Sequence, residues 1–325
     1  MRETPPGGGW IDVHHHCYHP ELAVALRASG VTQMAEGIPV PDWTVADSLR
    51  VMDTSGIAAA VLSVVLPGGE FDRVAICRQA NELSAAISAA RPDRFTALAV
   101  LPLPDVDAAL AELGYALDVL RMNGVVLTAS VSDGRMISDP AFAPVFDELD
   151  RRGAVVFLHP SPAYRCACTG GPEFPGLVPP VVVDFVMDTT RAVAGLLYGG
   201  TLRRCPRIRF VVAHAGGTVP YLASRLQLAA SWQVADGVRA AAQDTAHSLA
   251  GLYYETAQSF SPGTLACLRA VTDESHVLFG TDFPMLKDDG VAATRRAIAG
   301  SSVLNPAKVG RDNALALFPS LADDR

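Results

Sequence analysis

The stretch Ile11-Asp12-Val13-His14-His15-His16 decides the fold class, because a short apolar run ends there in side chains that bind metals. Successive side chains of a β-strand point to opposite faces, so we expect His14 and His16 on one face and His15 on the other. Two imidazoles at this spacing can bind one metal ion. The stretch therefore predicts a strand that ends at a metal site, and the rest of the chain must supply the remaining ligands.

Three later apolar runs end in the same kind of residue. They are Val155–His159, Phe210–His214 and Val277–Gly280, the last of which is followed by Thr281 and Asp282. The carboxyl ends of the parallel strands of a barrel meet at one face, so these side chains are expected to converge. The candidate ligands are His14, His16, His159, His214 and Asp282. Three or four of them can reach one ion, and nitrogen and carboxylate ligands suit Zn2+, Mn2+ or Fe2+.

Strand-like runs alternate with amphipathic helical stretches along the whole chain. The predicted strands are Trp10–His14, Ala58–Val65, Phe95–Leu101, Val125–Leu127, Ala154–His159, Ile208–His214, Leu252–Thr256 and Val277–Gly280. The predicted helices are Val45–Thr54, Arg73–Ala90, Val106–Leu120, Pro140–Arg151, Val181–Leu202 and Pro262–Ala270. This alternation predicts a single-domain (β/α)8 TIM barrel over residues 10–325, preceded by a flexible leader over residues 1–9. A doubly wound sheet is the alternative, but its Gly-rich turn after the first strand is replaced here by histidines.

Composition excludes several classes of function. The 325 residues carry 34 acidic and 26 basic side chains, a net charge of −8, and no long basic run, so nucleic acid is not an expected partner. Neither a signal peptide nor a membrane-spanning apolar run is apparent. The six dispersed cysteines favour reduced thiols in the cytoplasm. Cys166 and Cys168 are too closely spaced for a common structural zinc site, and their role is left open.

The ordered motifs resemble those of the amidohydrolase superfamily. They are His14-x-His16, His159-Pro160, His214-Ala215-Gly216-Gly217, Gly280-Thr281-Asp282-Phe283-Pro284 and the closing Gly310–Phe318. The pattern is similar to the aminocarboxymuconate-semialdehyde decarboxylase-like branch, and within it to 6-methylsalicylate decarboxylase-like proteins. This resemblance implies a TIM barrel with one divalent ion, usually zinc and sometimes manganese, and no organic cofactor. It implies that His14, His16, His159 and Asp282 bind the ion and that His214 acts on bound water or on the substrate.

Two departures from the family pattern narrow the expected number of metal ions and the expected substrate. Binuclear members of the superfamily use a lysine from strand four, whereas Lys287 and Lys308 are the only lysines here, which favours one ion. An arginine that binds a substrate carboxylate in aminocarboxymuconate decarboxylases is replaced by Pro39. The replacement argues against a muconate semialdehyde substrate.

Substrate contacts are predicted with alternatives. The resemblance implies a homodimer in which Arg225 reaches the neighbouring active site, and a surface ion pair is the alternative for this residue. Arg191 is a second candidate for anion binding, with an internal ion pair as its alternative. Trp43, Phe185, Phe260 and Phe283 are candidates for contact with an aromatic ring, or else ordinary core residues. The segments Ser29–Trp43 and Tyr164–Pro180 are expected to line the pocket.

We therefore expect a metal-dependent, non-oxidative decarboxylase of a small aromatic, ortho-hydroxybenzoate-like carboxylic acid. Asp282 is the expected proton donor, and bound water acting with His214 is the alternative. A metal-dependent hydrolase or hydratase acting on a lactone, amide or alkene at the same site is the second hypothesis. A catalytically silent binding barrel is the third, and it is disfavoured because all five site positions carry functional residue types.

Overall fold

Nine short parallel strands form a closed barrel in the computed structural model, which describes residues 9–35, 37–161 and 179–322. The strands are β1 (Trp10–His16), β4 (Ile57–Ser63), β5 (Phe95–Ala97), β6 (Ala99–Val100), β7 (Val125–Thr128), β8 (Val155–His159), β9 (Arg209–Val212), β10 (Tyr253–Glu255) and β11 (Val277–Leu278). They pair in the orders β1-β4-β5 and β6-β7-β8-β9-β10-β11. Strands β5 and β6 together occupy the predicted strand Phe95–Leu101, so the eight predicted positions are all present.

Backbone hydrogen bonds join the two sheets at both seams. Leu98, between β5 and β6, donates its N–H to the carbonyl of Leu62 (2.9 Å) on β4. At the other seam, Val13 donates to Phe279 (3.0 Å) and Asp282 donates to His14 (2.8 Å). The first strand therefore lies directly against the last, which confirms the predicted single-domain (β/α)8 barrel.

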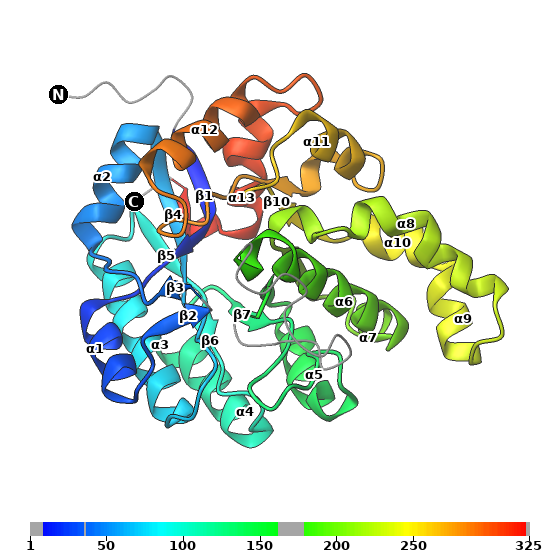
Figure 1. The fold of residues 1–325 in the computed structure, drawn as a ribbon, viewed down its shortest axis with the longest axis horizontal. Helices are drawn as coiled ribbons and strands as arrows, with labels where there is room; N and C mark the ends of the chain where they lie inside the picture. The colour runs from blue at the N-terminus through cyan, green and yellow to red at the C-terminus, as the bar shows by residue number, and fades with distance from the viewer. Residues whose placement is uncertain (1–8, 36, 162–178, 323–325) are drawn as a thin grey trace.

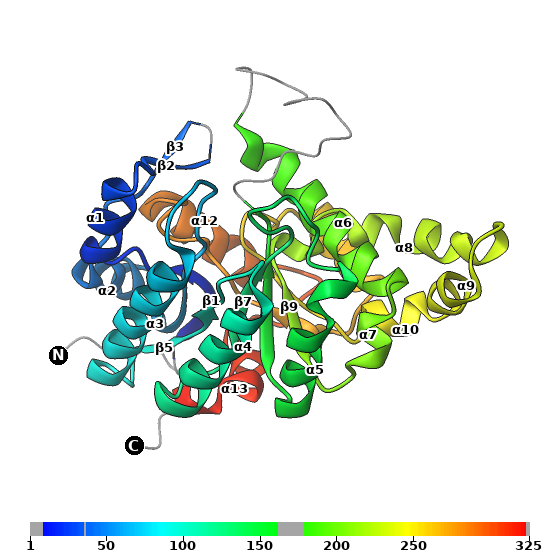
Figure 2. The same ribbon diagram turned by 90° about the horizontal axis from the view of Figure 1, so that it is seen from below.

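Helices surround the strands, as Figure 1 shows. They are α1 (Pro20–Ala28), α2 (Val45–Ser55), α3 (Arg73–Ala90), α4 (Val106–Gly114), α5 (Ala143–Arg152), α6 (Asp184–Tyr198), α7 (Thr201–Arg204), α8 (Val219–Leu228), α9 (Asp236–Gln243), α10 (Thr245–Ala250), α11 (Pro262–Arg269), α12 (Asp288–Ala299) and α13 (Asn313–Leu317). A hairpin of β2 (Gln33–Ala35) and β3 (Ile38–Pro39) stands at one end of the barrel (Figure 2). In both views α8, α9 and α10 project to one side of the molecule.

The predicted helices are present with small shifts of their ends, except that the predicted helix Val181–Leu202 is divided at Gly199 and Gly200 into α6 and α7. The side chains of Asp105 and Ser261 cap α4 and α11 by accepting backbone N–H groups of the first turn. The predicted helix Val106–Leu120 changes to a π-helical turn at Tyr115. The helices α1, α8, α9, α10, α12 and α13 lie in segments for which no helix is predicted from the sequence. Within the described residues, no helix is both long and apolar enough to cross a membrane. The predicted leader lies outside the described residues, except for Gly9.

The close packing of the strands predicts a contrast between two glycines. Gly124 precedes β7 with a φ of +153°, and a Cβ there would collide with the backbone of Val155 on β8. We expect Gly124→Ala to lower the free energy of unfolding by about 2–3 kcal/mol. Gly114, at the end of α4, has open space around it, so Gly114→Ala is expected to be neutral or stabilising by up to about 1 kcal/mol. Urea denaturation measures both, and equal effects would refute the packing argument.

Candidate active site

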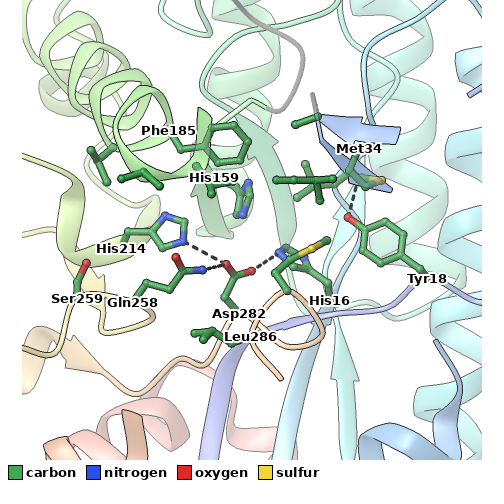
Figure 3. A pocket seen from close by; sticks show the side chains of 17 residues that line it. His16, Tyr18, Met34, His159, Phe185, His214, Gln258, Ser259, Asp282 and Leu286 are labelled. Atoms are coloured by element: carbon green, nitrogen blue, oxygen red, sulfur yellow. Dashed lines mark hydrogen bonds and ion pairs between the residues drawn. The ribbon is translucent and has the colours of Figure 1, made fainter. Parts of the chain in front are cut away.

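The structure brings His14, His16, His159 and Asp282 together at the carboxyl end of the barrel. Their ligand atoms all lie within 4.8 Å of one another, and all four residues are buried. Asp282 Oδ1 lies 3.2 Å from His14 Nε2 and 3.0 Å from His16 Nε2, and the two Nε2 atoms are 3.1 Å apart. Figure 3 shows the side chains of His16, His159 and Asp282 pointing toward one another. Such a convergence of nitrogen atoms and a carboxylate is the donor set of a divalent metal site.

The second ring nitrogen of each histidine is held by a separate partner. Each Nδ1 lies within hydrogen-bond distance of an oxygen: Glu255 Oε1 for His14 (3.0 Å), Ser63 Oγ for His16 (3.1 Å) and the Pro160 carbonyl for His159 (2.7 Å). This arrangement leaves Nε2 of each ring facing the centre, as metal-binding histidines require. His159 Nε2 and Asp282 Oδ1 are buried and have no hydrogen-bond partner among the described residues. The residues present therefore fit one divalent ion.

Electrostatics show how far the cluster depends on a cation. Burial lowers the pKa of His14, but the carboxylates of Glu255 and Asp282 outweigh this effect and raise the pKa to about 10. Burial holds the pKa of His159 well below its usual value, and the neighbouring histidines act in the same direction. Burial also raises the pKa of Asp282, yet His14 and the other imidazoles bring it well below the usual range. The carboxylates thus stabilise positive charge in the cluster, and a bound metal ion would supply that charge.

His214 lies beside the four-residue cluster. It follows β9 with a φ of +55°, and its Nε2 is 3.6 Å from Asp282 Oδ2. Its backbone N–H donates to Glu255 Oε1 (2.5 Å), the same oxygen that accepts from His14. Its Nδ1 is buried without a hydrogen-bond partner among the described residues. The geometry therefore leaves His214 free to act on a ligand of the site or on Asp282.

Glu255 is a site residue that is not among the candidates predicted from the sequence. It ends β10 with 0% exposure, and its Oε2 accepts the N–H of Ala257 (2.6 Å). A Cβ at Gly280 would touch both Glu255 and His14, so a glycine is needed for this close approach. The available signal was a single carboxylate at the end of the otherwise uncharged strand Leu252–Thr256.

A second carboxylate supports the cluster from below. Asp12, on β1, accepts hydrogen bonds from the backbone N–H of His14 (3.1 Å), from the N–H (3.0 Å) and hydroxyl (2.5 Å) of Thr281, and from His15 Nδ1 (3.0 Å). His15 Nε2 lies within hydrogen-bond distance of the Ser48 hydroxyl (3.0 Å). His15 thus faces away from the metal cluster, as predicted. Asp12 ties the strand of His14 to the segment that carries Asp282.

A cavity of about 480 Å³ opens beside the cluster and is bounded by His16, His159, His214 and Asp282. The apolar residues of its described wall are Met34, Ala35, Ile38, Val65, Val181, Val182, Phe185, Val186, Met285 and Leu286. The predicted lining segment Ser29–Trp43 contributes through the hairpin of β2 and β3. Of the segment Tyr164–Pro180, only Pro179 and Pro180 belong to the described residues.

Except for Phe185, the predicted substrate contacts lie outside the described wall of this cavity. Trp43 is buried in the core with 3% exposure, and Phe283 packs on the ring of His15 at 4.9 Å. Arg191 lies on α6 near Asp188, whose pKa burial raises to about 6 against the opposing charge of Arg191. Arg225 is exposed on α8. Besides the histidines, the aromatic rings of the described wall are those of Phe185 and Tyr18.

Comparisons with known proteins agree with this geometry. The model of the amidohydrolase family matches residues 11–320. The chain belongs to the amidohydrolase family. Among curated relatives, 6-methylsalicylic acid decarboxylase of Aspergillus aculeatus is 33% identical, with 96% of each chain covered. Gamma-resorcylate decarboxylase of Rhodococcus jostii is 29% identical, with 83% of this chain and 86% of the relative covered.

Solved structures support the barrel as well. A structure described as amidohydrolase II superposes with a TM-score of 0.85 at 27% identity, covering 95% of this chain and 99% of the other. A 2,6-dihydroxybenzoate decarboxylase superposes with a TM-score of 0.80 at 24% identity, covering 96% and 99% of the two chains. The predicted superfamily, branch and fold of this amidohydrolase are confirmed.

The hydrogen bonds of Asp12 predict a loss of metal affinity in Asp12→Asn. An amide in place of the carboxylate sets an NH2 group against the donors of Thr281 or His15. We expect about 10- to 100-fold weaker metal binding, as for other groups that orient ligands. Titration of chelator-treated protein with Zn2+ measures the affinity. Asp105→Asn, the same change at the cap of α4, is the control, and equal affinities in the two variants would contradict the role of Asp12.

Proposed function

We propose that this amidohydrolase is a carboxy-lyase that removes CO2, without oxidation, from a small aromatic acid of the ortho-hydroxybenzoate type. The observation that carries the proposal is the buried cluster of three histidines and Asp282, which opens onto a largely apolar cavity. The relatives named as decarboxylases of 6-methylsalicylic acid and gamma-resorcylate support the same reaction.

The reaction needs a proton and a place for negative charge. Loss of CO2 from an aromatic ring leaves an electron pair on the ring carbon, so a proton must reach that carbon as the carbon–carbon bond breaks. A divalent ion held by His14, His16, His159 and Asp282 would act as a Lewis acid toward the carboxylate and the ortho hydroxyl. We propose zinc, which suits this donor set, with manganese as the alternative.

We assign the proton transfer to Asp282 acting with His214. Oδ1 of Asp282 faces His14 and His16, whereas Oδ2 faces His214 and the cavity. His214, 3.6 Å from Oδ2, passes a proton to the ionised carboxylate of Asp282. Asp282 delivers this proton to the ring carbon that bears the carboxylate, the electron pair of the breaking bond forms the new C–H bond, and CO2 leaves. The apolar wall orients the ring and keeps water from competing.

CO2 release tests the proposal directly. Protein loaded with Zn2+ or Mn2+ is incubated with salicylate, 6-methylsalicylate and 2,6-dihydroxybenzoate, and CO2 is measured. We expect release from at least one acid, and His214→Gln is expected to lower kcat by about 10²- to 10⁴-fold with unchanged metal content. No release by the verified metal-loaded protein would refute the function. Incorporation of water oxygen into the product instead would establish the hydrolase or hydratase alternative.

We further propose that two copies associate through the projecting side of α8. Tyr221 (80% exposed), Arg225 and Leu228 (55% exposed) recur at spacings of four and three residues, so they share one helix face, and the exposed Trp232 follows nearby. Such an exposed apolar face is typical of a subunit contact. Arg225 would then reach the carboxylate of a substrate in the neighbouring subunit.

We also propose a cytoplasmic location. The four cysteines that the structure describes as free thiols support it.

The dimer predicts a change of mass when its apolar face is charged. Light scattering on wild-type protein is expected to give twice the chain mass of 34.2 kDa. Tyr221→Asp is expected to halve the mass, because a buried unpaired carboxylate is costly. Val24→Asp, which places the same charge at an exposed apolar residue (64%) on α1, provides the control. A monomeric wild type would refute the dimer and leave the decarboxylase proposal intact.

A further inference from the structure

Gln258 occupies an unusual backbone position at the cavity. It follows β10 with a φ of +54°, in the left-handed region that residues other than glycine rarely adopt. His214 (φ +55°) and Asp282 (φ +62°) share this feature, and all three line the cavity. Strained residues of this kind collect at functional sites. The backbone conformation of Gln258 therefore indicates a functional role for its side chain.

The amide of Gln258 has a fixed orientation. Its Nε2 donates a hydrogen bond to Asp282 Oδ2. A carboxylate only accepts hydrogen bonds, so the NH2 group must face Asp282 and the amide oxygen must point elsewhere. Figure 3 shows this oxygen turned away from the carboxylate. It makes no hydrogen bond within the described part of the chain.

The surroundings of that oxygen contain few other polar groups. Apart from the metal cluster and His214, the polar side chains of the described wall are those of Tyr18, Gln258 and Ser259. Tyr18 already donates its hydroxyl proton to the Val65 carbonyl (3.1 Å). A ligand that displaces water from the amide oxygen must replace the lost hydrogen bond, since an unpaired acceptor in an apolar site is costly.

We propose that Gln258 is a specificity-determining residue that accepts a hydrogen bond from a ring hydroxyl of the substrate. This inference rests on the proposed function and narrows its substrate class to aromatic acids with a hydroxyl that can donate at this point. The same amide links that hydroxyl to Oδ2 of Asp282, so a correct substrate also holds the proton donor in place. A methoxy group or a hydrogen atom at that ring position leaves the amide oxygen unpaired.

A double-mutant cycle on enzyme and substrate tests the inference. Wild type and Gln258→Met, which keeps the length of the side chain and removes both polar atoms, are each assayed with 2,4-, 2,5- and 2,6-dihydroxybenzoate and with analogues in which one hydroxyl is replaced by hydrogen or methoxy. Contacts of the substrate with the metal act in both enzymes and cancel. We expect coupling of about tenfold or more in kcat/KM for at least one hydroxyl. Ser259→Ala, at the next residue of the wall, is the control with coupling near one.

Further variants and a binding measurement keep the test decisive. Gln258→Gly relieves the backbone strain and removes the side chain, so the cycle can be repeated if Gln258→Met folds poorly. The same cycle is run on dissociation constants by calorimetry. If the wild type releases no CO2 from any acid, the proposed function fails while the binding cycle still tests Gln258. Coupling below about twofold for every hydroxyl, in rates and in binding, would overturn the inference.

Discussion

The hydrogen bonds of Asp12 connect the first strand of the barrel to the segment after the last. Its carboxylate accepts from the backbone of His14 on one side and from the backbone and hydroxyl of Thr281 on the other. Barrel closure and assembly of the metal site are therefore the same event. Two ligands, His14 and His16, come from β1, whereas Asp282 arrives from the far end of the chain, next to Thr281. Any error in the register of this seam would separate them.

Closure alone does not explain why so many polar groups tolerate burial. His14 and Glu255 are fully buried, and His16, His159 and Asp282 are at most 5% exposed. Removing such groups from water costs several kcal/mol per ion unless each is paired. Hydrogen bonds to Glu255, Ser63 and the Pro160 carbonyl satisfy the outer nitrogens, while the inner atoms satisfy one another poorly. The carboxyl end of the barrel thus carries buried nitrogen and oxygen atoms without partners, and a divalent ion would bind them.

The sequence was sufficient for the features that local periodicity encodes. Apolar runs ending in His14, His159 and Asp282 predicted the strand positions, and their shared position at strand ends predicted that they would converge. Glu255 and Gln258 were not predicted, because a lone carboxylate in its strand is the only local sign of Glu255 and no local pattern distinguishes Gln258. Glu255 acts through His14, more than two hundred residues away in the chain, and Gln258 acts through a left-handed backbone that only the folded turn reveals. Trp43 and Phe283 show the converse limit. Both lie in segments between a strand and a helix, where an aromatic side chain near a motif can pack into the core instead of the cavity.

The cavity separates two tasks between two kinds of surface. Valine, methionine and phenylalanine side chains from the β2–β3 hairpin and from α6 and its approach bind without directional preference, so they select for an apolar ring of suitable size. The groups that orient a ligand lie on the opposite wall. There His214, Gln258 and Asp282 each have a left-handed backbone conformation. Their backbone conformations cost folding energy and leave little freedom to adjust to a different ligand. Substitutions in the apolar wall can therefore change which ring fits the cavity. The position at which a proton is delivered does not change with them, because it depends on the contact between the first and last strands.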